Sequence, residues 1–407
     1  MNSPIGDEDI SPARKAFVVS KAHESISRYF AHWDQSRLSE RDLDDAVASV
    51  LDAALATRCR WDFTLTMMEF VSRFNNVHTR FIDDLLYRRP ALSVELRYVN
   101  GDWLVVSDGR HDLTKGDRVL AIDGVAMAGL FKRMSIYTQG SPQARRACFA
   151  QLVLHQLLHD EIELTVEDRR GLQHTVHVGR VPPGDARQAR LKHRWLRPGR
   201  IAYLRLPTFQ DPDLTRSAER QIGEYAQAAG LIIDVRGNAG GSTPTDLVAR
   251  LMDRPHRYWM DHAVLHFGQH TTIAGVDAIL AVLGEPSPSW AAQIRPGAAD
   301  GYRGKIAILA DGETMSAAED FIVPFRISRR AVVVGERTSG STGQPYFHRF
   351  PWNMMLAVGS IRSRFPDGAE FEGVGIEPDL HVSMSREDLY GNRDPVLDAA
   401  IAEIEES

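Results

Sequence analysis

The chain has 407 residues, of which 43% are hydrophobic, 25% are charged and 8% are aromatic. This composition is typical of a globular protein, and the length is too great for one compact core, so two or three packed units are expected. The formal net charge of -6 supplies no basic field for a nucleic acid or an anionic membrane, which makes both unfavourable as partners.

The two cysteines, Cys59 and Cys148, are far apart and form no CxxC or Cys/His cluster. The sequence therefore predicts neither a disulfide framework nor a structural zinc site, and a reducing compartment fits best. Residues 1–11 lack the basic start and apolar core of a secretory signal, and no uncharged apolar run approaches the roughly 20 residues that cross a bilayer. We expect a cytoplasmic protein that binds no membrane and needs no cofactor; the sequence does not indicate its oligomeric state.

The N-terminal part is predicted to be helical and the next part rich in strands. Helical periodicity extends from residue 12 to about 75. From Leu92 the chain changes to short alternating runs separated by turns, with one helix around 143–158, and this pattern predicts a small β-rich unit. The Pro182-Pro183-Gly184 break marks its expected end.

The remainder of the chain alternates strand and helix patterns. Such alternation implies βαβ units and a mainly parallel sheet. Residues 265–300, with several prolines and glycines, are interpreted as a long excursion from this sheet. The expected strands are 201–206, 231–235, 305–310 and 331–335, and the expected helices are 214–228, 244–253 and 316–327.

A glycine-rich turn follows the second of these strands, in the segment from Leu231 to Ser242. Turns of this kind present backbone N–H groups that can hold a phosphate or the oxyanion of an acyl intermediate. The endings of a P-loop and of a dinucleotide fingerprint are both absent. On this segment alone, a tight strand-to-helix turn without a ligand is the favoured interpretation.

A serine, Ser316, stands at the start of the helix that follows strand 305–310. The helix N-terminus would stabilise a developing negative charge, which suits a nucleophile. The alternative is a capping box, because Ser316 and Glu319 have the S-x-x-E spacing.

A nucleophilic serine needs a base and, usually, an acid that orients the base. His78 follows the N-terminal helices, and Glu372 lies in a glycine-bounded segment near the C-terminus. Taken alone, each is more simply interpreted as a surface residue or as a residue with only a structural role. His155 and His159 share one helix face, but no third metal ligand accompanies them, so no metal site is predicted.

In this order the motifs resemble the tail-specific, or carboxy-terminal processing, serine protease family, in its tricorn-core-like and interphotoreceptor-retinoid-binding-protein-like branch. The resemblance extends over 201–209, 231–242, 306–321, 335–345 and 371–382, with His78 and 116–124 upstream. It implies an α/β fold with a crotonase/ClpP-like core, an N-terminal helical segment and a PDZ-like module. By resemblance, the oxyanion hole would consist of the N–H of Ala317 and one N–H from Gly240 or Gly241.

The general base also follows from the resemblance. In the lysine-dyad branch a lysine stands where this chain has Ser341, whereas His78-Thr79 matches the histidine of the other branch and Glu372 matches its glutamate. The implied triad is Ser316, His78 and Glu372. Members of the tricorn-like branch carry a serine directly before the histidine, and this chain has Val77 there, which cannot form the same hydrogen bond.

These observations predict a serine endopeptidase that acts on peptides or proteins through an acyl-enzyme on Ser316. The expected organisation is a helical segment (1–87), a PDZ-like module (88–181) and a catalytic core (182–407). Two alternatives stay open. One is a catalytically weak protein of the same fold that binds peptides or apolar ligands, and the other is a crotonase-like acyl-CoA enzyme, which would not need the triad.

Overall fold

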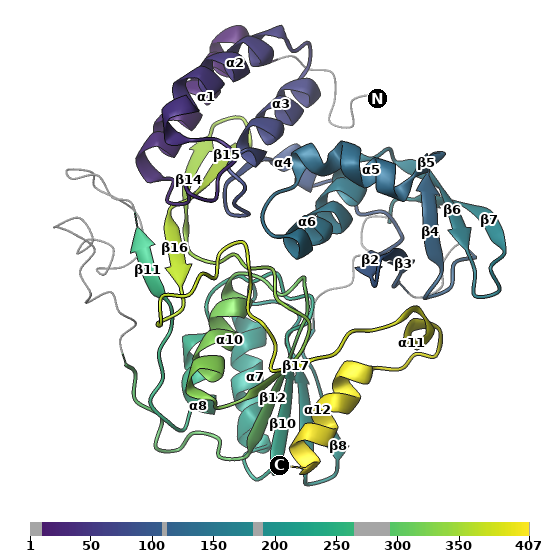
Figure 1. The fold of residues 1–407 in the computed structure, drawn as a ribbon, viewed down its shortest axis with the longest axis vertical. Coiled ribbons are helices and arrows are strands. Elements are labelled where there is room, and N and C mark those ends of the chain that lie inside the picture. The colour runs from purple at the N-terminus through teal and green to yellow at the C-terminus, as the bar shows by residue number, and fades with distance from the viewer. Residues whose placement is uncertain (1–9, 108–111, 182–189, 264–293, 407) are drawn as a thin grey trace. The chain divides into compact units, whose positions relative to one another are not determined.

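The computed structural model describes residues 10–107, 112–181, 190–263 and 294–406 (Figure 1). The chain divides into two compact units. The first comprises Met1–Ala186, His262–Ser287 and Gly343–Arg362, and the second comprises Arg187–Asp261, Pro288–Thr342 and Ser363–Ser407. Residues 1–9 of the segment predicted to lack a secretory signal, the break at 182–184 and most of the excursion at 265–300 lie outside the described residues.

The helices expected before residue 75 are present in the first unit. They are α1 (Pro12–Tyr29), the short η1 (Glu40–Asp42), α2 (Leu43–Ala56) and α3 (Arg60–Ser72). Pro12 occupies the first turn of α1, where its missing N–H has no intrahelical partner to lose. The helices pack with a three-stranded antiparallel sheet in the order β1-β15-β14, made of β1 (Arg80–Asp83), β14 (Pro345–Phe350) and β15 (Met354–Gly359).

The β-rich part of the first unit is an antiparallel sheet in the order β2-β3-β4-β6-β7, with β5 beside β4. The helix expected at 143–158 is α6, which continues as the π-helical η3 and buries Phe149 and Val153. Cys59 and Cys148 are free thiols. The strands are β2 (Leu96–Val99), β3 (Asp102–Val105), β4 (Arg118–Ile122), β5 (Val125–Ala126), β6 (Glu161–Glu167) and β7 (Gln173–Gly179), and the helices are α4 (Asp84–Tyr87), α5 (Met127–Met134), η2 (Ser135–Tyr137), α6 (Pro142–Cys148) and η3 (Phe149–Leu157).

The second unit has the mainly parallel sheet that the alternating pattern predicts. Its strand order is β17-β13-β12-β10-β9-β8, and only β8, which was not expected from the sequence, runs antiparallel to its neighbour. The strands are β8 (Lys192–Arg197), β9 (Ile201–Arg205), β10 (Gly230–Asp234), β12 (Lys305–Ala310), β13 (Val332–Gly335) and β17 (Leu380–His381).

Helices cover both faces of this sheet. One apolar cluster joins alternate strand residues to α7 (Pro212–Glu224), α8 (Thr245–Leu251) and α10 (Ala317–Ser328). The other cluster joins the opposite residues to α12 (Pro395–Glu406), which follows the short α11 (Arg386–Tyr390). Because both faces are covered, β10 is buried along its whole length, as its unbroken apolar run indicates. The chain passes between the units within β11 (Met260–Ala263) and β16 (Ile361–Arg364).

Candidate active site

The candidate site of the second unit lies at the carboxyl edge of its parallel sheet. In the register of the sheet, Asp234 pairs with Leu309, and Ala310 pairs with Gly335. The segments that follow β10, β12 and β13 therefore leave the same edge, where α/β sheets commonly place their functional groups.

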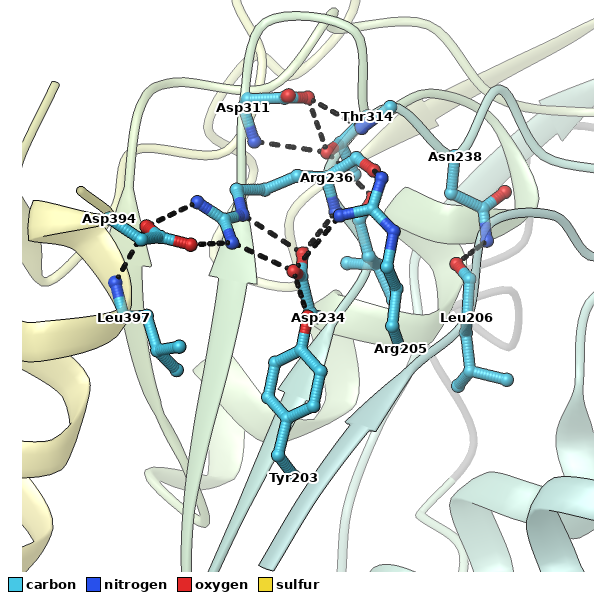
Figure 2. A network of polar contacts seen from close by, with 12 residues as sticks. Tyr203, Arg205, Leu206, Asp234, Arg236, Asn238, Asp311, Thr314, Asp394 and Leu397 are labelled. Carbon is cyan, nitrogen blue, oxygen red and sulfur yellow. Dashed lines mark hydrogen bonds and ion pairs between the residues drawn. The ribbon is translucent and has the colours of Figure 1, made fainter. Parts of the chain in front are cut away.

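The glycine turn after β10 is fixed by the side chain of Asn238. Its Oδ1 accepts the N–H of Gly240 at 2.9 Å. Its Nδ2 donates to the Leu206 carbonyl at 3.0 Å (Figure 2). Gly241 has φ +139°, and a Cβ there would lie 2.2 Å from the carbonyl carbon of Phe209. Only glycine fits this close approach of two backbone segments.

Ser316 has a backbone conformation that is rare for a residue with a Cβ, with φ 58° and ψ -125°. Its N–H donates to the Ser341 carbonyl at 3.0 Å and to Glu319 Oε2 at 3.0 Å. A sharp, strained turn from strand to helix is also how α/β hydrolases expose a nucleophilic serine, although the G-x-S-x-G sequence is absent here.

The glycine turn and the serine turn are in direct contact. A Cβ on Gly240 would lie 2.7 Å from the Cβ of Ser316 and 3.0 Å from the nitrogen of Ala317. Glycine at 240 thus permits the approach, and the first N–H of α10 lies beside the turn.

Two backbone N–H groups of these turns could hold an anion. Within the described part of the chain, the N–H groups of Gly241 and Ala317 donate to no acceptor, whereas the N–H of Gly240 is bound by Asn238. Of the two glycines that the sequence offered, Gly241 is therefore the better donor. Backbone N–H groups that converge near a nucleophile can stabilise a tetrahedral oxyanion.

The buried carboxyl group of Glu319 joins the serine turn to the loop after β13. Besides Ser316, it accepts the N–H of Gly340 at 2.7 Å, the N–H of Ser341 at 3.1 Å and the hydroxyl of Thr338. Burial raises the pKa of Glu319 to about 8, against the opposing effect of these hydrogen bonds. The sequence indicated Glu319 only as a helix-capping residue; its contacts with a loop some 20 residues away had no local signal.

Glu372 is buried in the same unit and contacts the same loop. Its Oε1 accepts the N–H of Thr342 at 2.9 Å. The preceding Phe371 packs against Trp259 with ring centroids 4.1 Å apart. Ser341 and Thr342 are consecutive residues, so the loop connects the backbone of Ser316 to the side chain of Glu372.

His78 belongs to the first unit, in the turn that precedes β1. Its side chain is buried and its N–H donates to Asn76 Oδ1 at 3.0 Å. Burial, with smaller contributions from Arg80 and His32, lowers the pKa of His78 to about 3, so the imidazole is neutral at physiological pH. The neighbouring Val77 packs against Gly140, where a Cβ would lie 2.5 Å from Val77 Cγ2.

Groups of three metal-ligating side chains are absent from the residues that the structure describes. His155 instead uses Nδ1 to accept the N–H of Leu92 at 3.1 Å. Among the described helices, none has the length and apolar character to cross a membrane.

Comparison with known sequences gives one family and several distant relatives. The model of peptidase family S41 matches residues 200–382. The chloroplastic C-terminal processing peptidase of Tetradesmus obliquus is 24% identical over 66% of this chain and 52% of its own length. Tricorn protease homolog 2 of Streptomyces coelicolor is 27% identical over 59% of this chain and 19% of its own length. The chain thus spans about half, or less, of the curated relatives it matches.

Solved structures show the same mixed α/β fold. The structure of mature CPAF has a TM-score of 0.72 and 16% identity, with 97% of this chain and 98% of that chain covered. The photosystem II D1 C-terminal processing protease has a TM-score of 0.55 and 18% identity, with 91% and 93% covered. At sequence identities this low, the TM-scores show a shared fold and nothing more specific.

Proposed function

We propose that this chain, a member of the tail-specific protease family (peptidase family S41), is a serine peptidase that hydrolyses peptide bonds through an acyl-enzyme on Ser316. One observation carries the proposal. Ser316 is held in a strained turn between the Gly240-Gly241 turn and the N-terminus of α10, where the N–H groups of Gly241 and Ala317 have no acceptor among the described residues.

In the proposed reaction, Ser316 Oγ attacks the scissile carbonyl carbon while His78 accepts the hydroxyl proton. The N–H groups of Gly241 and Ala317 bind the resulting oxyanion. As the C–N bond breaks, His78 passes the proton to the leaving amine, and the acyl group stays on Ser316. Water then attacks the ester, with His78 as base, and releases the acid.

The protonation state of His78 suits a base, because a neutral imidazole can accept a proton. Burial lowers its pKa to about 3, however, so the proposed role requires a charge beside the imidazole that stabilises its protonated form. The mechanism requires the imidazole within about 2.6–3.2 Å of Ser316 Oγ during catalysis. Glu372 would orient the imidazole and stabilise its protonated form. Ser341, which replaces the lysine of the other branch, is buried and binds Glu319 through its N–H.

We extend the proposal to the parts of the chain. Residues 1–87 would supply the base, 88–181 would form a PDZ-like module that receives an extended peptide, and 182–407 would form a crotonase/ClpP-like core. The five-strand antiparallel order β2-β3-β4-β6-β7 supports the second assignment, and the mainly parallel sheet of the second unit supports the third. The substrate would be a peptide or protein cleaved as an endopeptidase or from its C-terminal tail, and the location would be cytoplasmic.

Labelling with a fluorophosphonate probe tests the nucleophile. The wild-type chain should become covalently labelled on Ser316, and the Ser316→Ala variant should lose both labelling and peptide hydrolysis while its far-UV circular dichroism spectrum is unchanged. His78→Ala should be nearly as damaging as Ser316→Ala, and the double variant should be little worse, because members of a triad act as one unit.

Matched controls come from Ser339→Ala and His155→Gln, which alter a buried serine of the loop after β13 and a half-buried histidine of the same unit as His78. Both should keep labelling. If Ser316→Ala retains labelling, the nucleophile is another residue; if the wild-type chain binds peptides but is never labelled, the chain is a binding protein of this fold.

A further inference from the structure

A buried ion-pair network lies at the base of the glycine turn. The side chain of Asp234, at the end of β10, is fully buried and accepts hydrogen bonds from three residues (Figure 2). The Tyr203 hydroxyl donates at 2.7 Å, Arg205 donates at 3.1 Å, and Arg236 donates through two guanidinium nitrogens at 3.0 and 2.8 Å. Asp234 therefore fixes one side of the Arg236 guanidinium.

Asp394 fixes the other side of the same guanidinium. Its two carboxylate oxygens accept from Arg236 at 2.9 and 2.7 Å, a bidentate pair of the strong, directional kind. Asp394 also caps α12, because its Oδ1 accepts the Leu397 N–H at 3.0 Å. Asp394 is 158 residues from Arg236 and lies beyond the region that matches the peptidase family, so neither the motif nor the family predicts it.

Arg236 immediately precedes the turn that carries the Gly241 N–H. Its own N–H donates to Asp234 Oδ1 at 3.0 Å, and its carbonyl accepts from Arg205 at 3.3 Å. With both its main chain and its side chain held, Arg236 sets the direction in which residues 237–241 leave the sheet.

We propose that Asp394 is a positioning residue, which acts through Arg236 to hold the 237–241 turn in the geometry that the oxyanion requires. The inference rests on the proposed function. It gives α12 an indirect role in the reaction, exerted through Asp394 and the Arg236 side chain.

A purely structural role for Asp394 makes a different prediction. If Asp394 only caps α12, then Asp394→Asn should be silent, because asparagine is as good a cap as aspartate. Asparagine has one oxygen and no charge, however, so it cannot form the bidentate ion pair with Arg236. This substitution therefore separates the two roles.

The experiment compares Asp394→Asn with wild type on one peptide substrate. We expect kcat to fall about 10-fold to 100-fold with KM nearly unchanged, since a displacement of about 1 Å in a positioned group costs on the order of 10²-fold. Amide hydrogen exchange of residues 237–241 should become faster. The control is Glu405→Gln, which removes the 3.1 Å ion pair of Arg197 with Glu405, another link between α12 and the sheet. It should leave kcat and this exchange unchanged.

Three outcomes would overturn the inference while Ser316→Ala remains inactive: an unchanged kcat in Asp394→Asn, an equal loss in Asp394→Asn and Glu405→Gln, or a loss confined to KM. If Ser316→Ala instead retains activity, the proposed function itself fails. Exchange at 237–241 then still tests Asp394, because an unchanged rate in Asp394→Asn would show that it does not hold the turn.

Discussion

Ser316 combines an unfavourable backbone conformation with strong anchoring. A residue other than glycine in a sparsely populated region of positive φ costs on the order of 1–3 kcal/mol and persists only where its surroundings enforce it. Two acceptors hold the Ser316 N–H, and one of them, Glu319, is buried and holds the neighbouring loop as well. Such strain is expected at a functional residue.

Glycine at position 316 should give a more stable fold than alanine. Glycine adopts positive φ without a steric penalty, so relief of strain should exceed the extra entropy of the unfolded chain. We expect the Ser316→Gly variant to be about 1 kcal/mol more stable than Ser316→Ala, whose Cβ keeps the strain. Urea denaturation of the two variants measures the difference. A less stable Ser316→Gly variant would mean that the turn is not strained.

At the scale of elements, the site is built from turns that follow parallel strands. Each strand ends at the same sheet edge, and the glycines are placed where two turns come into contact. Gly241 shows this most clearly, because its φ of +139° coincides with a backbone approach that leaves no room for a side chain.

Gly241→Ala should distort the turn and weaken the oxyanion donor. The new Cβ would meet the Phe209 backbone, which cannot rotate away as a side chain could. We expect labelling of Ser316 to slow at least about tenfold, since loss of one oxyanion donor costs about 10²–10³-fold in kcat. Gly368→Ala is the matched control: Gly368 also has positive φ, at +87°, but nothing lies within 4 Å of its Cβ position. Equal slowing in both variants would assign the effect to backbone strain in general.

Sequence patterns predicted these elements well and their long-range contacts poorly. The alternation of apolar runs and helical periodicity gave the strands at 201–206 and 305–310 nearly as observed, because burial on both faces leaves a local signal. The antiparallel strand β8 was not predicted, since its residues are mostly exposed and polar. Asp394 was missed for a different reason, since a capping aspartate has the same local appearance whether or not an arginine 158 residues away binds it.

At the scale of the whole molecule, the two units carry buried titratable groups of opposite behaviour. In the first unit, burial lowers the pKa of His32 to about 4 and of His78 to about 3. In the second unit, burial raises the pKa of Glu319 to about 8 and of Asp261 to about 6. Each unit therefore contributes its own pH dependence to the free energy of unfolding.

The direction of each pH dependence follows from whether the folded or the unfolded state binds more protons. Unfolded histidine, with a pKa near 6.5, is protonated below that pH while the buried histidines stay neutral, so their contribution is lost as pH falls from about 6.5 toward 4. Folded Glu319 holds its proton above pH 4.5, so its contribution is lost as pH rises from about 4.5 to 8. The buried histidines should make the first unit sensitive to acid, and Glu319 should make the second unit sensitive to alkali. Burial also lowers the pKa of His256, so the second unit has an acid-side contribution as well.

Urea denaturation between pH 4.5 and 8 tests this assignment with two variants. In His32→Gln the acid-side loss should be smaller by up to about 1.4 kcal/mol per pH unit, because glutamine does not titrate. In Glu319→Gln the loss of unfolding free energy at alkaline pH should be smaller than in wild type, and the loss at acidic pH should be unchanged. Hydrogen exchange resolves the two units: amides of α3 and β1 should lose protection first in acid, and amides of β12 and α10 should lose it first in alkali. A variant that changed both limbs would contradict the assignment of one limb to the substituted group. If protection were lost uniformly at both extremes, the two units would unfold as one cooperative structure, and their buried titratable groups would then limit the stability of the whole chain together.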